Sequence, residues 1–268
     1  MSIEDDIRSH WFLKYIGKRP SQFGGSRTIY VNSHPINYRE TADESMMVIL
    51  GGNNMQHAPC FVLDMNRETG EAVLQTVEHR RHAGHSLCFR DGHAIAGDIV
   101  SAAYQLARAR GMRTLTLTDK SKLTCDELEF SLCDLMFLTT GQTWYESILP
   151  NLRCTNCEDI DEYRTVVRTS TWRDVGASLI DLDTGNIDPD EPGSAMRVLD
   201  AMKKSKDFCW FFKKNMGKLL VNSRINTMRG TVWVCDITAD RSRYRSTRRR
   251  KGQRSPSGTR RIVWKRGV

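Results

Sequence analysis

Residues 88–121 constrain the fold most, because they read as a small-residue loop, a helix and a strand in direct succession. Gly92 and Gly97 bracket the loop. Asp98 follows them, and its side chain is placed to cap a helix by accepting amide hydrogens of the first turn. Amides at such a helix start can bind an anion such as pyrophosphate, but a simple tight turn uses the same glycines. These residues alone leave both interpretations open.

The predicted helix and strand follow from residue spacing. One apolar face recurs at intervals of three and four residues, which predicts a buried helix side formed by Ile99, Ala102, Ala103, Leu106 and Ala107. Gly111 is placed where a helix ends in a left-handed turn. Leucines alternate with threonines through residues 113–119, which predicts a strand.

Strands are also predicted before this stretch. Residues 60–65 and 72–79 alternate apolar and polar side chains around a turn at 66–70, which is typical of a β-hairpin. Residues 27–32 and 46–50 predict two further strands. Residues 3–16 predict an amphipathic helix that packs on the body, and no secretory signal is expected.

Two motifs follow the predicted helix: Leu117-Thr118-Asp119-Lys120-Ser121 and Gly141-Gln142-Thr143-Trp144-Tyr145. With the order hairpin, small-residue loop, helix, strand and helix, the chain resembles GNAT-type N-acetyltransferases. The motifs make it more similar to acetyltransferase-like proteins of nucleocytoplasmic large DNA viruses. The resemblance covers roughly residues 45–150 and implies a GNAT-like central sheet.

The resemblance also implies site residues. The loop would hold the pyrophosphate of acetyl-CoA through Arg90, Gly92, His93, Ala94, Ile95, Ala96 and Gly97. Tyr145 would protonate the departing thiolate, and Glu78 would take the proton from the substrate amine. The family's loop begins with Gln or Arg where this chain has Phe89, with Arg90 one place later. Trp144 and Tyr145 can equally be packing aromatics.

Histidines and cysteines suggest metal sites at two places. His79, His82, His85 and Cys88 are zinc-ligand types, but a spacing of three does not converge on a helix, and neighbouring arginines oppose a cation. We therefore predict a solvated basic hairpin end and no metal. Cys154-Thr155-Asn156-Cys157 is the chain's single CxxC, so structural or incidental thiols are expected there.

The second half is predicted from patterning alone. Residues 126–138 predict a helix, and Thr143 with Glu146 form a capping box. Residues 158–193 read as an acidic, turn-rich linker around one strand at 165–172. A helix from Ser194, an aromatic cluster at 208–212 and a strand at 231–237 complete the pattern.

The positive charge is concentrated at the C-terminal end. Of the 40 Lys and Arg, 12 lie in residues 241–268, which hold no acid, so the other 240 residues carry 28 basic against 32 acidic side chains. Such a tail should be disordered on its own and bind phosphates or acidic protein surfaces. Its basic residues are Arg241, Arg243, Arg245, Arg248, Arg249, Arg250, Lys251, Arg254, Arg260, Arg261, Lys265 and Arg266.

The sequence thus predicts a mixed α+β fold in four segments: an N-terminal helix and loop (1–44), a GNAT-like core (45–150), an annex that completes or packs on the sheet (151–240), and the tail (241–268). The expected function is a virus-encoded structural or packaging-associated protein whose tail binds nucleic acid or virion proteins. The alternative is an acetyl-CoA-dependent N-acetyltransferase. No membrane span is expected, and eight scattered cysteines favour a reducing intracellular compartment.

Overall fold

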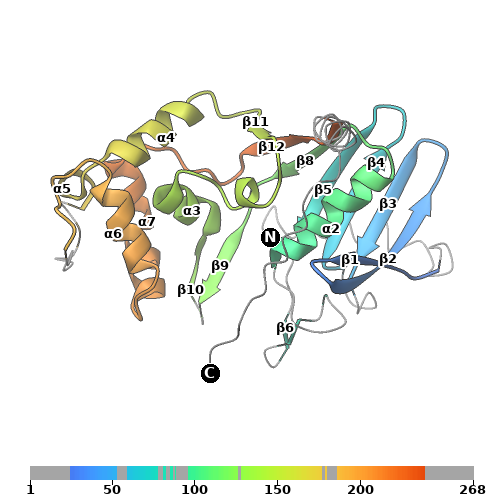
Figure 1. The fold of residues 1–268 in the computed structure, drawn as a ribbon, viewed down its shortest axis with the longest axis horizontal. Helices are drawn as coiled ribbons and strands as arrows, with labels where there is room; N and C mark the ends of the chain where they lie inside the picture. Colours follow the sequence, from blue (N-terminus) through green and yellow to red (C-terminus); the bar gives the residue numbers. More distant parts are fainter. Residues whose placement is uncertain are drawn as a thin grey trace, which may run out of the picture.

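The computed structural model describes residues 25–52, 59–77, 81–82, 85–86, 88, 96–125, 128–176, 179 and 186–238. An eight-stranded sheet runs through the molecule in the order β1-β2-β3-β4-β5-β8-β12-β11. Helix α2 covers one part of the sheet, and a group of helices packs beside the other (Figure 1). The predicted mixed α+β fold is confirmed at this level. Among the described residues, no helix is long and apolar enough to cross a membrane.

Five consecutive strands form an antiparallel meander. They are β1 (Arg27–Val31), β2 (His34–Ala42), β3 (Met46–Gly51), β4 (Phe61–Asn66) and β5 (Glu71–Val77). The predicted strands in this region are confirmed. In the β4–β5 hairpin, Asn66 Oδ1 accepts the amide hydrogens of Glu68 and Thr69 at 2.9 and 3.0 Å, and Gly70 has a φ of 69°. This local bonding makes the turn.

A parallel crossover follows the meander. Helix α2 (Ala96–Ala109) leads to β8 (Thr114–Thr118), which pairs in parallel with β5. The predicted apolar face of α2 is buried, and Gly111 ends the connection with a φ of 79°. The pairing joins Glu71 through Leu74 to Thr114 through Leu117. Beyond Leu74, β5 continues to Val77 without pairing to β8, while it still pairs with β4.

The start of α2 differs from the prediction. The helix begins at Ala96, so Asp98 lies inside the first turn and is not the cap. Its carboxylate is buried and accepts a hydrogen bond from Asn32 Nδ2 at 2.6 Å. Asn32 lies in the β1–β2 turn, with a φ of 48°. Asp98 therefore fastens α2 to that turn.

Two C-terminal strands extend the sheet. Strand β12 (Val232–Asp236) pairs antiparallel with β8 on one side and with β11 (Leu152–Cys154) on the other. The predicted strand at 231–237 is confirmed. Trp233 is fully buried, and its indole N–H donates to Thr231 Oγ1 at 2.8 Å. Residues more than a hundred positions apart thus lie side by side.

The prediction of a helix over 126–138 is half wrong. Strands β9 (Lys122–Cys125) and β10 (Leu128–Ser131) form a hairpin, and helix α3 (Leu132–Thr140) begins only after Ser131. Ser131 Oγ accepts the Asp134 amide hydrogen at 3.3 Å, which caps α3. Gly141, with a φ of 70°, ends it.

The strand expected at 165–172 is also wrong. Helices α4 (Ile160–Thr169) and α5 (Trp172–Gly176) occupy these residues. Acids in the first turn of α4 favour the helix, and Val167 turns inward. The predicted helix from Ser194 is confirmed as α6 (Ser194–Met202), and the aromatic cluster opens helix α7 (Phe208–Asn222).

The apolar residues form two cores. The first lies between α2 and the sheet and includes Leu63, Ile99, Ala103, Leu117 and Trp233. The second lies between α3, α4, α5, α6, α7 and β10. It is built from Phe130, Phe137, Val167, Trp172, Leu199 and Phe212, among others.

Candidate functional site

A buried polar cluster lies where the two cores meet. Its centre is Asp119, directly after β8 and fully buried. Asp119 Oδ1 accepts hydrogen bonds from the Ser121 amide at 3.0 Å and the Ser121 hydroxyl at 2.6 Å. Its backbone N–H donates to Thr231 O at 2.8 Å, and its carbonyl accepts from Gly230 N at 2.7 Å. The Leu-x-Asp-x-Ser motif thus ties the end of β8 to the segment that enters β12.

Two further side chains complete this cluster. Cys133, in the first turn of α3, belongs to the second core, and its sulfur lies 3.0 Å from Ser131 Oγ. Tyr145 belongs to the first core and is 6 % exposed. Its ring meets Trp144 edge to face, with the ring centroids 4.9 Å apart. We call Asp119, Ser121, Cys133 and Tyr145 the junction cluster.

Burial governs the acid–base chemistry of the junction cluster. Burial raises the pKa of Asp119, and the hydrogen bonds from Ser121 only partly oppose this shift. Burial and the negative charge of Asp119 raise the pKa of the Cys133 thiol to about 12. The same two causes, burial first, raise the pKa of Tyr145. At neutral pH Cys133 is therefore a thiol and a poor nucleophile, and Tyr145 keeps its proton.

Two buried oxygens lack partners, one in the junction cluster and one two residues before Tyr145. Asp119 Oδ2 and Thr143 Oγ1 have no hydrogen-bond partner within the described residues. Unpaired buried oxygens are uncommon because each costs desolvation free energy.

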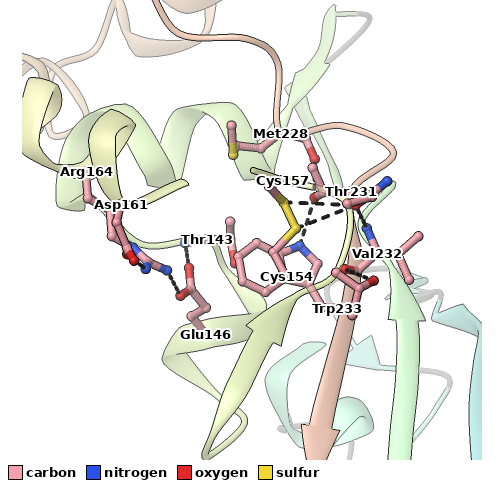
Figure 2. Close-up of a disulfide and its surroundings, with 12 residues drawn as sticks. Thr143, Glu146, Cys154, Cys157, Asp161, Arg164, Met228, Thr231, Val232 and Trp233 are labelled. Carbon is pink, nitrogen blue, oxygen red and sulfur yellow. Dashed lines mark hydrogen bonds and ion pairs between the residues drawn. A yellow bond between two sulfur atoms is a disulfide. The ribbon is translucent and has the colours of Figure 1, made fainter. Parts of the chain in front are cut away.

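The predicted capping box is present in part. Figure 2 shows Glu146 between Thr143 and Arg164. Glu146 Oε2 accepts the Thr143 amide hydrogen at 2.7 Å, and Oε1 pairs with Arg164 of α4. The helix that follows is one 3₁₀ turn, η2 (Tyr145–Ser147), and ends before Pro150. The Thr143 hydroxyl does not cap it, which departs from the reciprocal box.

The residues expected to bind acetyl-CoA are described only in part. Ala96 and Gly97 lie in the first turn of α2 and not in a loop. Arg90, Gly92, His93, Ala94 and Ile95 lie outside the described residues, as does Glu78. The structure therefore places Tyr145 and leaves the other two parts of the predicted acetyltransferase site as predictions.

The cysteines of the described chain are mostly paired, which contradicts the expectation of free thiols. Cys60, directly before β4, forms a disulfide with Cys88, and Cys154 forms one with Cys157. Cys209 is also disulfide-bonded, whereas Cys133 and Cys235 are free and buried. Because Cys88 is bonded to Cys60, it is not available as the fourth ligand of the histidine series. Within the described residues, no group of three metal-ligating side chains converges.

The histidine segment forms a short hairpin in its described part. Strands β6 (Arg81–His82) and β7 (His85–Ser86) pair antiparallel, with His82 opposite His85. A hairpin end was predicted here. His79 and the N-terminal residues 3–16 lie outside the described residues, and so do the 12 basic residues of the tail.

The CxxC motif joins β11 to α4 at the sheet edge. Figure 2 shows the Cys154–Cys157 disulfide beside Val232. Asn156, between the two cysteines, accepts the Val232 amide hydrogen through Oδ1 at 2.7 Å. The Thr155 amide donates to Val232 O at 2.9 Å. Cys154 and Cys157 are half-buried. The disulfide therefore holds the turn that fastens β11 to the start of β12.

Sequence reasoning missed Cys133 as a site residue. It lies in a stretch read as one continuous helix, and no motif links it to Asp119. The N-cap serine at position 131 was the available signal, because a cap there sets the helix start and points Cys133 inward.

In comparisons with known proteins, no family model, curated protein or solved structure matches this chain.

Proposed function

We propose that this chain is a non-catalytic, virus-encoded structural or packaging-associated protein on a GNAT-like scaffold. In this proposal residues 241–268 bind nucleic acid or neighbouring virion proteins. The scaffold proposal is supported by the order meander, α2 and parallel strand β8, which the resemblance leads one to expect.

One observation carries the non-catalytic proposal. The motif residues that the resemblance marks, Asp119 and Tyr145, are packed into the junction between two cores. Asp119 holds Ser121 and the segment before β12 through four hydrogen bonds. Tyr145 is buried against Trp144. A side chain committed to packing in this way serves stability, whereas an acid in acetyl transfer must reach a bound thioester.

The disulfides agree with this proposal. Disulfides persist in oxidising surroundings and at virion surfaces and are rare among enzymes of the reducing cytosol. Both Cys60–Cys88 and Cys154–Cys157 lie within the fold that would serve as the scaffold. A protein that ends in the virion, after synthesis in the infected cell, fits this pattern better than a cytosolic acetyltransferase.

The acetyltransferase remains the second candidate because of one observation. The parallel pairing of β5 with β8 stops at Leu74 and Leu117, although β5 continues to Val77. Where two parallel strands separate, their backbone groups can bind a ligand, and a cofactor's amide groups are suitable partners. Acetyl-CoA would bind at the end of β5, on the side toward β8, where pairing with β8 has stopped while pairing with β4 continues.

Titration calorimetry of acetyl-CoA into the full-length protein separates the two candidates. The proposal predicts no heat of binding up to millimolar acetyl-CoA. Micromolar binding would favour the enzyme, provided that Gly92→Trp abolishes it while the circular dichroism spectrum is unchanged. For the tail, the triple variant Arg248→Glu, Arg249→Glu, Arg250→Glu should lose binding to nucleic acid or to viral particles. Unchanged binding of both would contradict the proposed role of the tail.

A further inference from the structure

Helix α7 exposes an aromatic and basic surface that neither the proposed structural role nor the alternative acetyltransferase uses. Trp210 is 50 % exposed and Val221 is 75 % exposed, and both belong to the few exposed large hydrophobics of the described chain. Residues 210, 214, 217 and 221 share one side of the helix, because they recur at intervals of four, three and four residues. We define the α7 face as Trp210, Lys213, Lys214, Lys218 and Val221.

The middle of the α7 face is open. Gly217 lies between Trp210 and Val221 on this side of the helix, and no other atom lies within 4 Å of the position that a Cβ would take there. Because a helix rises 1.5 Å per residue, Trp210 and Gly217 are about 10 Å apart along the axis. A flat ligand stacked on the indole would therefore meet no side chain at position 217.

Lysines are frequent in and just before α7. Residues 203–218 contain six lysines and one acid, and Lys203 and Lys204 pair with Asp200. The lysines of α7 itself are Lys213, Lys214 and Lys218. Lys214 Nζ lies over one face of the Trp210 ring, 4.7 Å from its centroid, so a base would stack on the opposite face. Lys213 Nζ donates to the backbone carbonyl of Glu129 at 2.7 Å, and the Glu129 carboxylate pairs with Lys122. The charge of Lys213 is thus held in place without being neutralised by that carboxylate.

These groups match one class of ligand. Lysine ammonium groups bind phosphates as point charges, and an exposed indole can stack on a base of any identity. Stacking requires an unpaired base, which a duplex does not offer at its side. We propose that the α7 face binds single-stranded nucleic acid without sequence preference. This inference adds a second contact surface to the proposed function, and it rests on described residues apart from the tail.

The test uses the full-length protein and a fluorescently labelled 15-nucleotide oligothymidine, with binding followed by anisotropy at several salt concentrations. Trp210→Ala should weaken binding roughly 5- to 100-fold, the range expected for one stacked base. Trp210→Phe should retain most of the affinity because it keeps an aromatic ring. Because Trp210 is half-exposed, neither change should unfold the protein, which circular dichroism checks.

Charge reversal gives an independent readout. Each phosphate contact on a single strand contributes about 0.7 to the slope of log affinity against log salt. The double variant Lys214→Glu, Lys218→Glu should therefore lower the slope by about 1.4, whereas Trp210→Ala should leave it unchanged. Tyr30→Ala and Arg67→Glu are the matched controls. Tyr30 lies on β1 and Arg67 in the β4–β5 turn, and both are exposed. Strands β1 and β4 lie away from α7 (Figure 1).

Two results would overturn the inference. One is Trp210→Ala binding within twofold of the wild type. The other is that Trp210→Ala weakens binding to a 15-base-pair duplex or to poly-glutamate as much as it weakens binding to oligothymidine. The surface would then bind any acidic polymer. The triple tail variant distinguishes this inference from the proposed function. If only the tail variant loses binding, the α7 proposal is refuted and the tail proposal stands. If only the α7 variants lose binding, the tail proposal is refuted and the α7 proposal stands.

Discussion

The disulfide between Cys60 and Cys88 should stabilise the protein far more than the one between Cys154 and Cys157. A disulfide lowers the entropy of the unfolded chain in proportion to the logarithm of the loop that it closes. The sequence separations are 28 and 3 residues. These values correspond to about 3.6 and about 1.6 kcal/mol at 25 °C. The predicted difference is therefore about 2 kcal/mol.

Two double variants test this difference: Cys60→Ala with Cys88→Ala, and separately Cys154→Ala with Cys157→Ala. For a chain of this size, 1 kcal/mol changes the midpoint of thermal unfolding by about 2–4 °C. We expect losses of roughly 7–14 °C for the first pair and 3–6 °C for the second. Cys60 and Cys88 are both buried, so the small cavities left by alanine add to the first loss.

Thermal unfolding without reductant, followed by circular dichroism, measures both losses, and urea titration checks the free energies. Equal losses, or a larger loss for the Cys154 pair, would refute the loop-entropy reasoning. Wild-type protein in excess dithiothreitol is the internal control. If reductant leaves its unfolding midpoint unchanged, the two pairs are not bonded in solution, and the argument for a virion environment fails with them.

Three further substitutions probe packing and charge. Burial raises the pKa of Asp119, so the folded protein holds that proton where the unfolded chain, with a pKa near 3.8, has lost it. The contribution of Asp119 to stability is therefore complete below pH 3.8 and falls as pH rises from there to the folded pKa. Between pH 3.5 and 7, the urea midpoint of Asp119→Asn should rise relative to that of the wild type. Midpoints that change with pH in parallel for both proteins would contradict the burial argument. Gly51→Ala would place a Cβ 1.9 Å from a ring carbon of Phe61, so unfolding free energy should fall by about 1–3 kcal/mol. Asp134→Ala removes the acceptor of hydrogen bonds from Met228 N at 2.6 Å and Thr227 Oγ1 at 2.8 Å, and chemical denaturation should show a loss of about 3 kcal/mol.

Much of the sheet was predictable because its signals are local. The β4–β5 hairpin is set by alternation and by Asn66 and Gly70 in the turn, and all of this information lies within one short stretch. Helix α2 was predicted for the same reason, since its buried face recurs at helical spacing. Only its start was misplaced, because Asp98 is a good cap residue that the fold uses instead to bind Asn32.

The errors in the second half have tertiary causes. Residues 165–172 are rich in valine and threonine, whose β-branched side chains favour strands. In the structure most of them are helical, because the second core buries Val167 against its neighbours. In residues 126–138, the alternation of Leu128 and Phe130 was hidden by acids that suit a helix start. Strand pairing with β9 decided that stretch.

The junction cluster and the α7 face could not be found from the sequence. Asp119 and Tyr145 come together through packing between the two cores, and no spacing rule encodes such a meeting. The aromatic cluster at 208–212 did not indicate which of its rings would be exposed. Helical geometry buries Phe211 and Phe212 but turns Trp210 outward. Disulfide partners 28 residues apart were likewise beyond inference from spacing.

The place of β12 in the sheet has a consequence for biosynthesis. Strand β12 lies between β8 and β11, so β8 must wait for a partner that follows it by more than a hundred residues. At ribosomal rates of about 5–20 residues per second, that delay is roughly 6–23 s. During this time the edge of β8 offers unpaired amides and carbonyls, because Leu115 and Leu117 do not yet have their β12 partners Cys235 and Trp233. A nascent chain of this protein is therefore exposed to edge-to-edge pairing with other chains for longer than a chain whose sheet is built from consecutive strands.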